Sequence, residues 1–590
     1  MKKIINEPEN MVVEMCNGLV MAHPELEFLK KYKIIKKKNI NKDKVTIISG
    51  GGSGHEPAHA GFVGEGMLDA AVCGEIFASP SQIQIYNAIK ETKSNKGTLL
   101  IIKNYSGDVM NFKNAAHLAI EDGLIVDYIK VEDDIAVEDS LYTIGRRGVA
   151  GTVLVQKIAG AASEMGMSLY EVKDIAQKAA NNVRTLGFAL TSCTVPAKGT
   201  PTFDLEENEI GFGVGIHGEP GIMREKISSA DELAKKIINN ILIDMNIEET
   251  MEDVAILING FGATPLQELY ILNNSVMKEL FNRNIKVYTS FVGNYMTSID
   301  MAGASISIMK LDKELKHLLS KKSEAPGFKV SNKFLPTEYV DCSEEDDNKV
   351  DDDNMDICFD LVTDKKYSKL EDYIFTLENM IYLVDKMSDI IIKNEVKFCE
   401  LDAYVGDGDF GMSISNGFKQ LKREWSRIIS IKDLNIGKFL NECSMIIMEY
   451  CGGASGPIWG SAFRSAARFV GSKKSLTLLN FANMMNAVVN GVQSTGERSF
   501  GRGAGVGDKT LIDALVPCAN SWELSVKEND TFKQAFKRAA KSAVEGAEST
   551  KNIVARMGRA GNVGKRSLGY PDAGAYALGV IFSELSNDFK

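Results

Sequence analysis

The chain has 590 residues and a mass of 64.6 kDa, so it is too long for a single folding unit. Its 44% hydrophobic and 25% charged residues are ordinary globular usage and exclude a disordered chain. No apolar run approaches the ~18 residues that a membrane span requires, and the start of the sequence lacks the apolar stretch of a secretory signal. We therefore expect a cytoplasmic protein of several domains.

The net charge is −11, with an isoelectric point near 5.4, and no basic cluster is interleaved with aromatic residues, which argues against nucleic-acid binding. Residues 341–360 alone hold ten acidic residues and one lysine. Because like charges repel and the segment has few large apolar residues, residues 326–362 are predicted to form a linker. The nine cysteines are scattered without C-x-x-C spacing, which favours a reducing compartment.

Before the linker, short β-rich apolar runs alternate with helix-like stretches such as 80–92 and 230–245. This alternation predicts an α/β architecture. A wide gap separates the early runs from the late ones, so two subdomains are expected, about 1–185 and 186–325. The predicted strands are 45–49, 98–103, 253–260, 286–293 and 304–310.

After the linker the pattern becomes helical. In the segment 373–392, apolar residues recur on one helical face at 374, 377, 381 and 384. Strand-like alternation is absent, so residues 363–590 are predicted to form an all-helical domain whose functional groups come from loops at helix ends. The other helical patterns lie in 437–450, 474–492, 509–516, 530–550 and 573–587.

A glycine-rich loop, SGGGSGHEPAHAGFVGEG at 49–66, directly follows a predicted strand and precedes a predicted helix. Ligands of open α/β sheets bind at this position. The loop does not match the dinucleotide pattern G-x-G-x-x-G, so its glycines are expected to let backbone N–H groups approach a small polar ligand.

A second glycine-rich run, GAGVGDKT at 503–510, resembles a phosphate-binding P-loop except that Asp508 replaces a glycine. A carboxylate would repel phosphate there, and the preceding segment is predicted to be helical rather than a strand. We therefore reject a P-loop, although Lys509 and Thr510 remain candidates for another kind of nucleotide contact.

All six histidines lie before the linker, so chemistry in the helical domain must use carboxylates. His55 and His217 sit in similar glycine-lined contexts, GSGHEP and GVGIHGEPG, and are predicted to line one cleft with Asp108, which follows a predicted strand. The alternative is that each is a turn residue bonded to solvent. His59 is expected to be a hydrogen-bonded histidine in a helix.

Three aspartates, Asp402, Asp407 and Asp409, fall within LDAYVGDGDFG. Three such close carboxylates repel one another unless a cation neutralises them, and their oxygens suit Mg²⁺ or Ca²⁺. The spacing does not fit an EF-hand. A solvated acidic turn is the alternative.

These motifs resemble those of the dihydroxyacetone (glycerone) kinase family. The first 330 residues resemble its substrate-binding K domain through the loop at 49–66, NYSGDVMNF, LTSCTVP and GVGIHGEPG, and residues from about 370 resemble its nucleotide-binding L domain through LDAYVGDGDFG, GGASGPIWG, GDKTLIDALVP and GRAGNVGKRSLGYPDAGA. The resemblance implies an α/β K domain of two subdomains and an all-α helical barrel, fused as in the ATP-dependent form rather than the form whose separate subunits receive phosphate from a phosphotransferase relay.

For the K domain, the resemblance implies that His217 holds the substrate covalently as a hemiaminal. It also implies that His55 and Asp108 act as acid and base. The residues expected to hold the triose by hydrogen bonds are Gly52, Ser53, Gly54 and Lys103.

For the L domain, the resemblance implies that the three aspartates bind Mg²⁺ on ATP. The sequence has Phe410 where the family often has histidine, which removes one possible phosphate donor, and Ala573 where the family has proline. Asp572 is still expected to cap the following helix. The expected nucleotide-binding residues are Phe410, Gly411, Met412, Ala454, Ser455, Lys509, Thr510, Asp572 and Gly574.

The resemblance implies ATP-dependent phosphorylation of dihydroxyacetone, with glyceraldehyde as a possible second substrate, in a homodimer that binds neither nucleic acid nor membrane. Three alternatives stay open: a kinase for another short ketose such as erythrulose, a cyclising FAD-AMP lyase side activity, and a non-catalytic triose sensor.

Overall fold

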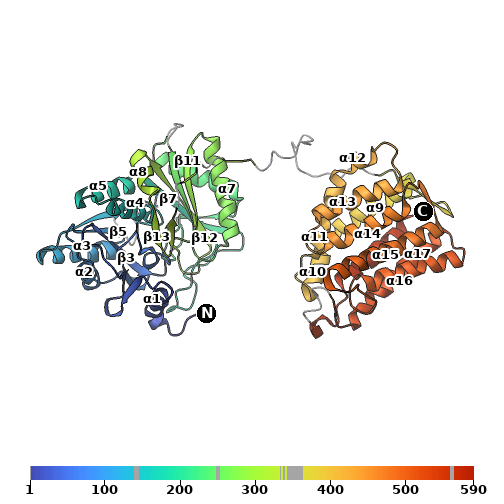
Figure 1. The fold of residues 1–590 in the computed structure, drawn as a ribbon, viewed down its shortest axis with the longest axis horizontal. Coiled ribbons are helices and arrows are strands. Elements are labelled where there is room, and N and C mark those ends of the chain that lie inside the picture. The colour runs from blue at the N-terminus through green and yellow to red at the C-terminus, as the bar shows by residue number, and fades with distance from the viewer. Residues whose placement is uncertain are drawn as a thin grey trace. The chain divides into compact units, whose positions relative to one another are not determined.

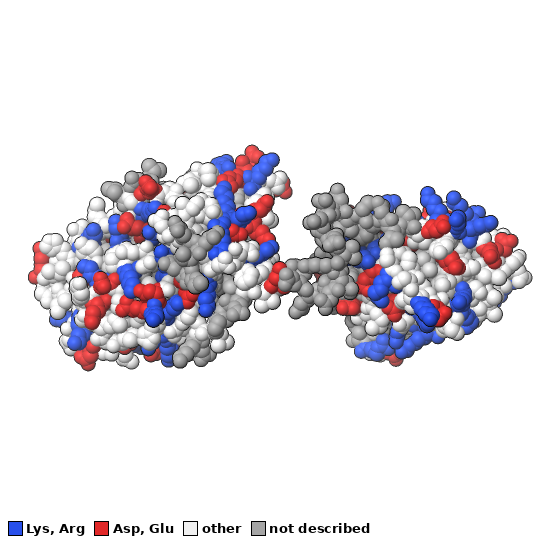
Figure 2. All heavy atoms as spheres, turned by 90° about the horizontal axis from the view of Figure 1, so that it is seen from above, with Lys and Arg blue, Asp and Glu red and all other residues white. Residues whose placement is uncertain are grey.

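The computed structural model describes residues 2–138, 145–247, 253–331, 334–335, 339–341, 363–557 and 564–590. The chain forms two compact units, Met1–Asn348 and Lys349–Lys590, which we describe separately. Most of the predicted linker, residues 342–362, lies outside the described residues. On the face of the first unit displayed in Figure 2, acidic and basic side chains are interspersed.

The first sheet of the first unit has the strand order β1-β2-β4-β3-β5-β6. Its strands β3 and β5 are labelled in Figure 1. β3, β4, β5 and β6 run parallel, whereas β1 and β2 join the edge antiparallel. β4 and β5 lie on opposite sides of β3, so the strand order reverses at β3, where an open sheet forms its ligand crevice. The strands are β1 (Leu26–Leu29), β2 (Ile34–Lys37), β3 (Thr46–Ser53), β4 (Ala70–Ile76), β5 (Thr98–Lys103) and β6 (Val126–Val131).

The second sheet has the order β11-β10-β12-β7-β8-β9, and only its β10–β11 pair is parallel. A separate two-stranded sheet joins β13 to β14. These strands are β7 (Val183–Ala189), β8 (Glu209–Phe212), β9 (Met223–Lys226), β10 (Asp253–Gly260), β11 (Lys286–Gly293), β12 (Gly303–Leu311), β13 (Ser323–Ala325) and β14 (Phe328–Val330).

Helices cover the sheets in layers because alternate strand residues face opposite sides. In β5, Leu100 and Ile102 pack against α2 and α3, whereas Leu99 and Ile101 join a core with α4 and α5. That same core contains Leu257 of the second sheet, whose other face packs against α6 and α7. The helices are α1 (Met11–Ala22), α2 (Gln82–Glu91), α3 (Ser106–Glu121), α4 (Thr152–Glu164), α5 (Leu169–Asn181), α6 (Ala230–Asp244), α7 (Leu266–Asn282) and α8 (Lys313–Leu319).

The α/β prediction is confirmed, and each of the five predicted strands coincides with β3, β5, β10, β11 or β12. Three details differ from the sequence expectation. The subdomain boundary at 185 falls inside β7, and the two sheets share a core. β14 lies within the range assigned to the linker. The glycine-rich loop at 49–66 leads to a short 3₁₀ turn and then β4, not to an α-helix.

The second unit is helical, as predicted, and its helices enclose an apolar core containing Trp425 and Trp522. α9 begins at Leu377, later than the pattern suggests, because Ile374–Thr376 forms β15, which pairs with β16 (Ser475–Thr477). The helices are α9 (Leu377–Lys393), α10 (Glu395–Val405), α11 (Phe410–Arg423), α12 (Trp425–Ile429), α13 (Ile436–Tyr450), α14 (Ser455–Val470), α15 (Leu478–Phe500), α16 (Ile512–Lys527), α17 (Phe532–Ser549) and α18 (Ala573–Asp588).

Several helix starts follow directly from the sequence. Thr376 and Asn379 form a reciprocal capping box at α9, and Asp572 caps α18 by accepting a hydrogen bond from the Ala575 N–H at 2.8 Å. The expected cap at Asp572 is therefore present despite Ala573. Among the described residues, none of the helices combines the length and the apolar character that crossing a bilayer requires.

Candidate active site

The first candidate site lies where β3, β4 and β5 end side by side. Gly52, Ser53 and His55 occupy the end of β3 and the residues just after it, and Lys103 is the last residue of β5. Asp108 lies in the first turn of α3. The parallel pairing of these strands brings their carboxyl ends to one edge of the sheet, which is why residues 50 positions apart meet.

The glycines let the backbone pass close to charged and aromatic side chains. A Cβ at Gly51 would lie 3.1 Å from the Lys103 Nζ atom, and one at Gly52 would lie 2.7 Å from the Ala78 backbone nitrogen. Gly54 has a φ of +104°, which other residues rarely adopt. The loop therefore needs glycine for space and for backbone conformation.

His217 reaches this edge from the second sheet, on the connection between β8 and β9. Its Nε2 atom lies 3.3 Å from Nε2 of His55, and the two rings meet edge to face at a centroid distance of 4.8 Å. The Nδ1 atom of His55 lies 2.9 Å from the Thr297 carbonyl. A carbonyl only accepts, so Nδ1 of His55 carries a proton and Nε2 of neutral His55 accepts from His217.

Burial shifts the pKa values of this cluster. Desolvation, followed by the positive charge of Lys103, lowers the pKa of both His55 and His217 well below the usual value, so both imidazoles are neutral at physiological pH. Burial lowers the pKa of Lys103 and raises that of Asp108, while each opposes the shift of the other. Their Nζ and Oδ2 atoms are 4.0 Å apart.

The site contains polar atoms that are buried and lack a hydrogen-bond partner in the structure. They include Nζ of Lys103, Oδ1 of Asp108, Nδ1 of His217 and the hydroxyl of Tyr105. Since buried polar groups normally pair, these atoms mark a place for a small polar ligand. The Ser53 hydroxyl, in contrast, donates to the Gly74 carbonyl at 2.8 Å, so only its lone pairs remain for a ligand.

Two aromatic residues at this site were not predicted. The rings of Phe77 and Tyr105 pack on His217 at centroid distances of 5.3 and 4.4 Å, and Phe77 also stacks on His55. Tyr105 lies within the NYSGDVMNF motif, and Phe77 directly follows β4. Their positions next to strand ends were the one feature of the sequence that could have indicated a place in this site.

Arg147 and Glu219 were also not predicted from the sequence. They anchor the loop that carries His217, residues 213–222 between β8 and β9. Glu219 accepts a hydrogen bond from the His217 backbone N–H at 2.7 Å and pairs with Arg147 at 3.1 Å. Buried Arg147 also donates to Asp134 at 2.7 Å and to the Gly213 carbonyl at 3.0 Å. The guanidinium therefore ties both ends of the loop to the segment that follows β6.

His59 was expected to lie in a helix, but the structure does not place it in an α-helix. It precedes the 3₁₀ turn that begins at Ala60, is buried, and its Nδ1 atom lies 2.8 Å from the Gln156 amide nitrogen. Its Nε2 atom has no partner, and burial lowers its pKa well below the usual value.

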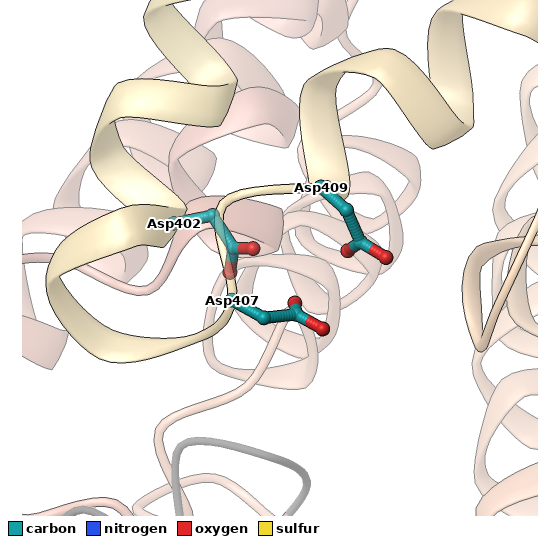
Figure 3. A group of neighbouring side chains, drawn as sticks. All are labelled: Asp402, Asp407 and Asp409. Carbon is teal, nitrogen blue, oxygen red and sulfur yellow. The ribbon is translucent and has the colours of Figure 1, made fainter. Parts of the chain in front are cut away.

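A second candidate site lies in the helical unit at the aspartate trio (Figure 3). Asp402 extends from the end of α10, Asp407 from the following turn, and Asp409 from the residue that precedes α11. One carboxylate oxygen from each lies within 4.8 Å of the other two. Burial raises the pKa of Asp402, and the negative charges of the other two add to this. The three predicted carboxylates therefore lie close together, and their all-oxygen donor set suits a hard divalent cation.

The other predicted nucleotide residues gather at three helix starts. Phe410, Gly411 and Met412 form the first turn of α11. Ala454 and Ser455 begin α14, and Asp572 and Gly574 begin α18. The N–H groups of a first helical turn lack partners within the helix and point at anions, which suits phosphate.

Side-chain contacts connect these helix starts. The Ser413 hydroxyl on α11 donates to the Gly452 carbonyl at 2.6 Å, next to the start of α14. Burial raises the pKa of Asp572 to about 7, with smaller contributions from the negative charges of Asp513 and Asp402. The rings of Tyr404 and Tyr570 stack at 4.2 Å with an interplanar angle of 8°.

Lys509, which was predicted to bind the nucleotide, faces backbone carbonyls in the structure. The three N–H groups of its buried ammonium are shared among four backbone carbonyls, so each N–H has an acceptor. Asp508 pairs with Arg502 and accepts from the Gly505 N–H, which agrees with the rejection of a P-loop. The Thr510 N–H donates to Asp513 at 2.8 Å, and its predicted role stays a prediction.

Two protein families match the chain. A Dak1 domain matches residues 17–327, and a DAK2 domain matches residues 404–587. These matches coincide with the α/β unit and the helical unit.

Two relatives illustrate the similarity. A putative 3,4-dihydroxy-2-butanone kinase from Solanum lycopersicum is 35% identical over 598 residues, which cover 98% of this chain and 97% of the relative. The dihydroxyacetone-binding subunit of a PTS-dependent dihydroxyacetone kinase from Lactococcus lactis is 53% identical over 320 residues, which cover 54% of this chain and 96% of the relative.

A solved structure is similar along the whole length. The dihydroxyacetone kinase from C. freundii, in complex with AMP-PNP and Mg²⁺, superposes with a TM-score of 0.60 at 29% sequence identity and covers 99% of each chain. With both domains present and full-length similarity, this chain belongs to the dihydroxyacetone kinase family whose members carry a Dak1 and a DAK2 domain on one polypeptide.

Proposed function

We propose that the protein transfers the terminal phosphate of ATP to dihydroxyacetone, which the α/β unit holds as a hemiaminal on His217. The single observation that carries this proposal is the pair of neutral imidazoles, whose Nε2 atoms are 3.3 Å apart at the end of β3. A protonated imidazole cannot attack a carbonyl carbon, so desolvation of the pair favours this chemistry.

In the proposed attachment, the Nε2 proton of His217 passes to Nε2 of His55 while Nε2 of His217 bonds to the carbonyl carbon. The π bond of the carbonyl breaks, and His55 returns the proton to the new alkoxide. The product is a neutral hemiaminal with no net change in protons. The hydrogen bond between His55 and Thr297 supports this role because it leaves Nε2 of His55 free to accept.

Asp108 is proposed to take the proton of the hydroxyl group that attacks phosphate. Burial raises its pKa, which makes it a stronger base than an exposed aspartate, and nearby Lys103 favours its ionised form. The unpartnered Nζ of Lys103 and the backbone of Gly52, Ser53 and Gly54 are proposed to bind the hydroxyl groups of the triose.

The donor set of the helical unit fits Mg²⁺. Asp402, Asp407 and Asp409 supply only carboxylate oxygens, within the spacing of one cation, and their mutual repulsion requires a positive charge. When bound there, Mg²⁺ would neutralise charge on the ATP phosphates. The helix starts at Phe410, Ser455 and Asp572 are proposed to bind the nucleotide.

Substrate comparison tests the proposal: release of ADP is measured with dihydroxyacetone, erythrulose and glycerol, with and without Mg²⁺. We expect turnover with the ketones and very little with glycerol, which has no carbonyl for His217 to attack and leaves buried polar groups unpaired. No ketone-stimulated release of ADP would overturn the proposal.

The four-carbon ketose erythrulose is the second candidate substrate, because a relative from Mycolicibacterium smegmatis is named L-erythrulose 1-kinase. The same assay decides between them through the ratio of kcat/KM for erythrulose and dihydroxyacetone.

We also propose that the protein forms a homodimer. Sedimentation of the full chain tests this proposal, and a monomer at assay concentration would contradict it.

A further inference from the structure

The loop between α17 and α18 contains only two short 3₁₀ turns among its described residues, 550–557 and 564–572, so many of its carbonyls lack regular partners. Four of them converge on one ammonium group. The Nζ atom of Lys509 lies 2.9 Å from the Thr550 carbonyl, 3.2 Å from Ile553, 2.5 Å from Ser567 and 2.7 Å from Tyr570.

Lys509 is fixed from its own side as well. It is 1% exposed, with a φ of +62°, and it lies three residues before Ile512, the first residue of α16. On one side of it, Asp508 pairs with Arg502; on the other, the Thr510 N–H donates to Asp513. The backbone next to Lys509 is therefore tied to α16 through Asp513, while the ammonium contacts carbonyls from a distant part of the sequence.

Two contacts carry this arrangement to the predicted nucleotide site. The Asp572 N–H donates to the Thr550 hydroxyl at 2.9 Å, so the cap of α18 is tied to a residue that Lys509 holds. The ring of Tyr570, whose carbonyl Lys509 also holds, stacks on Tyr404. Tyr404 lies in α10, two residues after Asp402 of the trio.

We propose that Lys509 is a positioning residue, an internal cation that orders residues 550–557 and 564–572 and thereby places Asp572 and the aspartate trio for ATP. The proposal rests on the function proposed above. The proposal gives a role to the motif at 503–510, which resembles a P-loop but does not fit phosphate binding. Lys509 binds backbone carbonyls instead of phosphates, so the carboxylate of Asp508 has no phosphate to repel.

The test replaces Lys509 by alanine and by methionine in the full chain and measures three quantities: the affinity for AMP-PNP with Mg²⁺ by calorimetry, the KM for ATP, and formation of the ketone adduct by intact-protein mass spectrometry. We expect the nucleotide affinity to fall by about tenfold or more, because four buried acceptors lose their donor. Formation of the ketone adduct, which belongs to the other unit, should not change.

Methylammonium should partly restore nucleotide binding to Lys509→Ala, because it returns a cation with N–H donors to the carbonyls, whereas it should do nothing for the wild type. Lys565→Met is the matched control, since Lys565 is an exposed lysine of the same loop. Nucleotide affinities of both Lys509 variants within about twofold of the wild type would overturn the proposal.

Tyr570→Leu keeps Lys509 and the backbone carbonyl but removes the ring stack, so it tests the link if the Lys509 variants do not fold. We expect it to raise the Mg²⁺ concentration required for nucleotide binding; an unchanged requirement would overturn the link to the trio. A wild type that binds AMP-PNP but shows no ketone-stimulated turnover would refute the proposed function and leave this inference standing.

Discussion

The Nε2 atoms of His55 and His217 face each other across 3.3 Å although the residues are 162 positions apart and belong to different sheets. His55 follows β3 of the first sheet, and His217 lies between two strands of the second. The two sheets meet in a shared core that includes Leu99 and Leu257. The histidine pair therefore forms only when both sheets have packed on that core, which links the geometry of the candidate site to the folding of the whole first unit.

Replacement of His217 by glutamine should abolish the mass increment that dihydroxyacetone gives on the intact protein under non-denaturing conditions, because the amide nitrogen of glutamine is not nucleophilic. His117→Gln is the control, since His117 is a well-exposed histidine on α3. An increment that persists in His217→Gln would show that another residue bonds the ketone.

His59 should make the first unit less stable in acid. Burial holds the pKa of folded His59 well below 6.5, whereas the unfolded chain takes up a proton near 6.5. Below that pH the unfolded state binds more protons than the folded state. The free energy of unfolding therefore decreases as pH falls, by about 1.4 kcal/mol per pH unit, until the pH reaches the pKa of folded His59. His59→Gln should reduce the slope of unfolding free energy against pH between 6.5 and 5.

Chemical denaturation at several pH values measures this slope. Other groups act in the opposite direction: burial raises the pKa of Asp134 to about 6, and that of Glu56 is raised too. The folded state therefore retains protons on these carboxyls that the unfolded state has released, and stability falls as pH rises through this range. The difference between wild type and variant removes this shared contribution; equal slopes would contradict the prediction.

Local sequence patterns predicted strands and helices well where a strand is buried and rich in β-forming residues or where a helix start is capped. Strand 98–103 appears with its predicted bounds because its six residues are buried and β-rich, and helix 530–550 appears as α17 behind the capping box of Thr531 and Gln534. The four-residue strands β1, β2, β8 and β9 were not predicted, because they are short and show little alternation. The longer strands β4, β6 and β7 were also missed.

The sequence predicted those parts of the candidate sites that lie in or next to glycine-containing motifs. His55 and His217 are brought together, Asp108 lies beside Lys103, and the three aspartates cluster. Arg147 could not be predicted, because its partners come from segments that meet only in the folded chain. The surroundings of Lys509 could not be predicted, since a motif does not reveal whether a lysine faces a ligand or backbone carbonyls.

Arg147→Lys should weaken ketone binding without changing nucleotide binding. A lysine cannot reproduce the fork that joins Asp134, Glu219 and the Gly213 carbonyl, so the His217 loop loses part of its anchorage. We expect the KM for dihydroxyacetone to rise by about tenfold while the KM for ATP stays constant.

Glu219→Gln is the milder companion, because the amide oxygen can still accept from the His217 N–H but no longer pairs as a charge with Arg147. Its KM for dihydroxyacetone should fall between those of the wild type and Arg147→Lys. Equal rises in both KM values would indicate a general loss of structure rather than a role in holding His217.

Asp407→Asn should raise the Mg²⁺ concentration at half-maximal activity by about tenfold or more, because affinity for hard cations depends on the number of charged oxygen ligands. The variant should also weaken AMP-PNP binding in the presence of Mg²⁺ and leave the ketone adduct on His217 intact. Asp433→Asn provides the control, since Asp433 is an exposed aspartate of the same unit, between α12 and α13. If Asp407→Asn responded to Mg²⁺ as Asp433→Asn does, the trio would be a solvated acidic turn, and the cation that ATP requires would have to bind elsewhere in the helical unit.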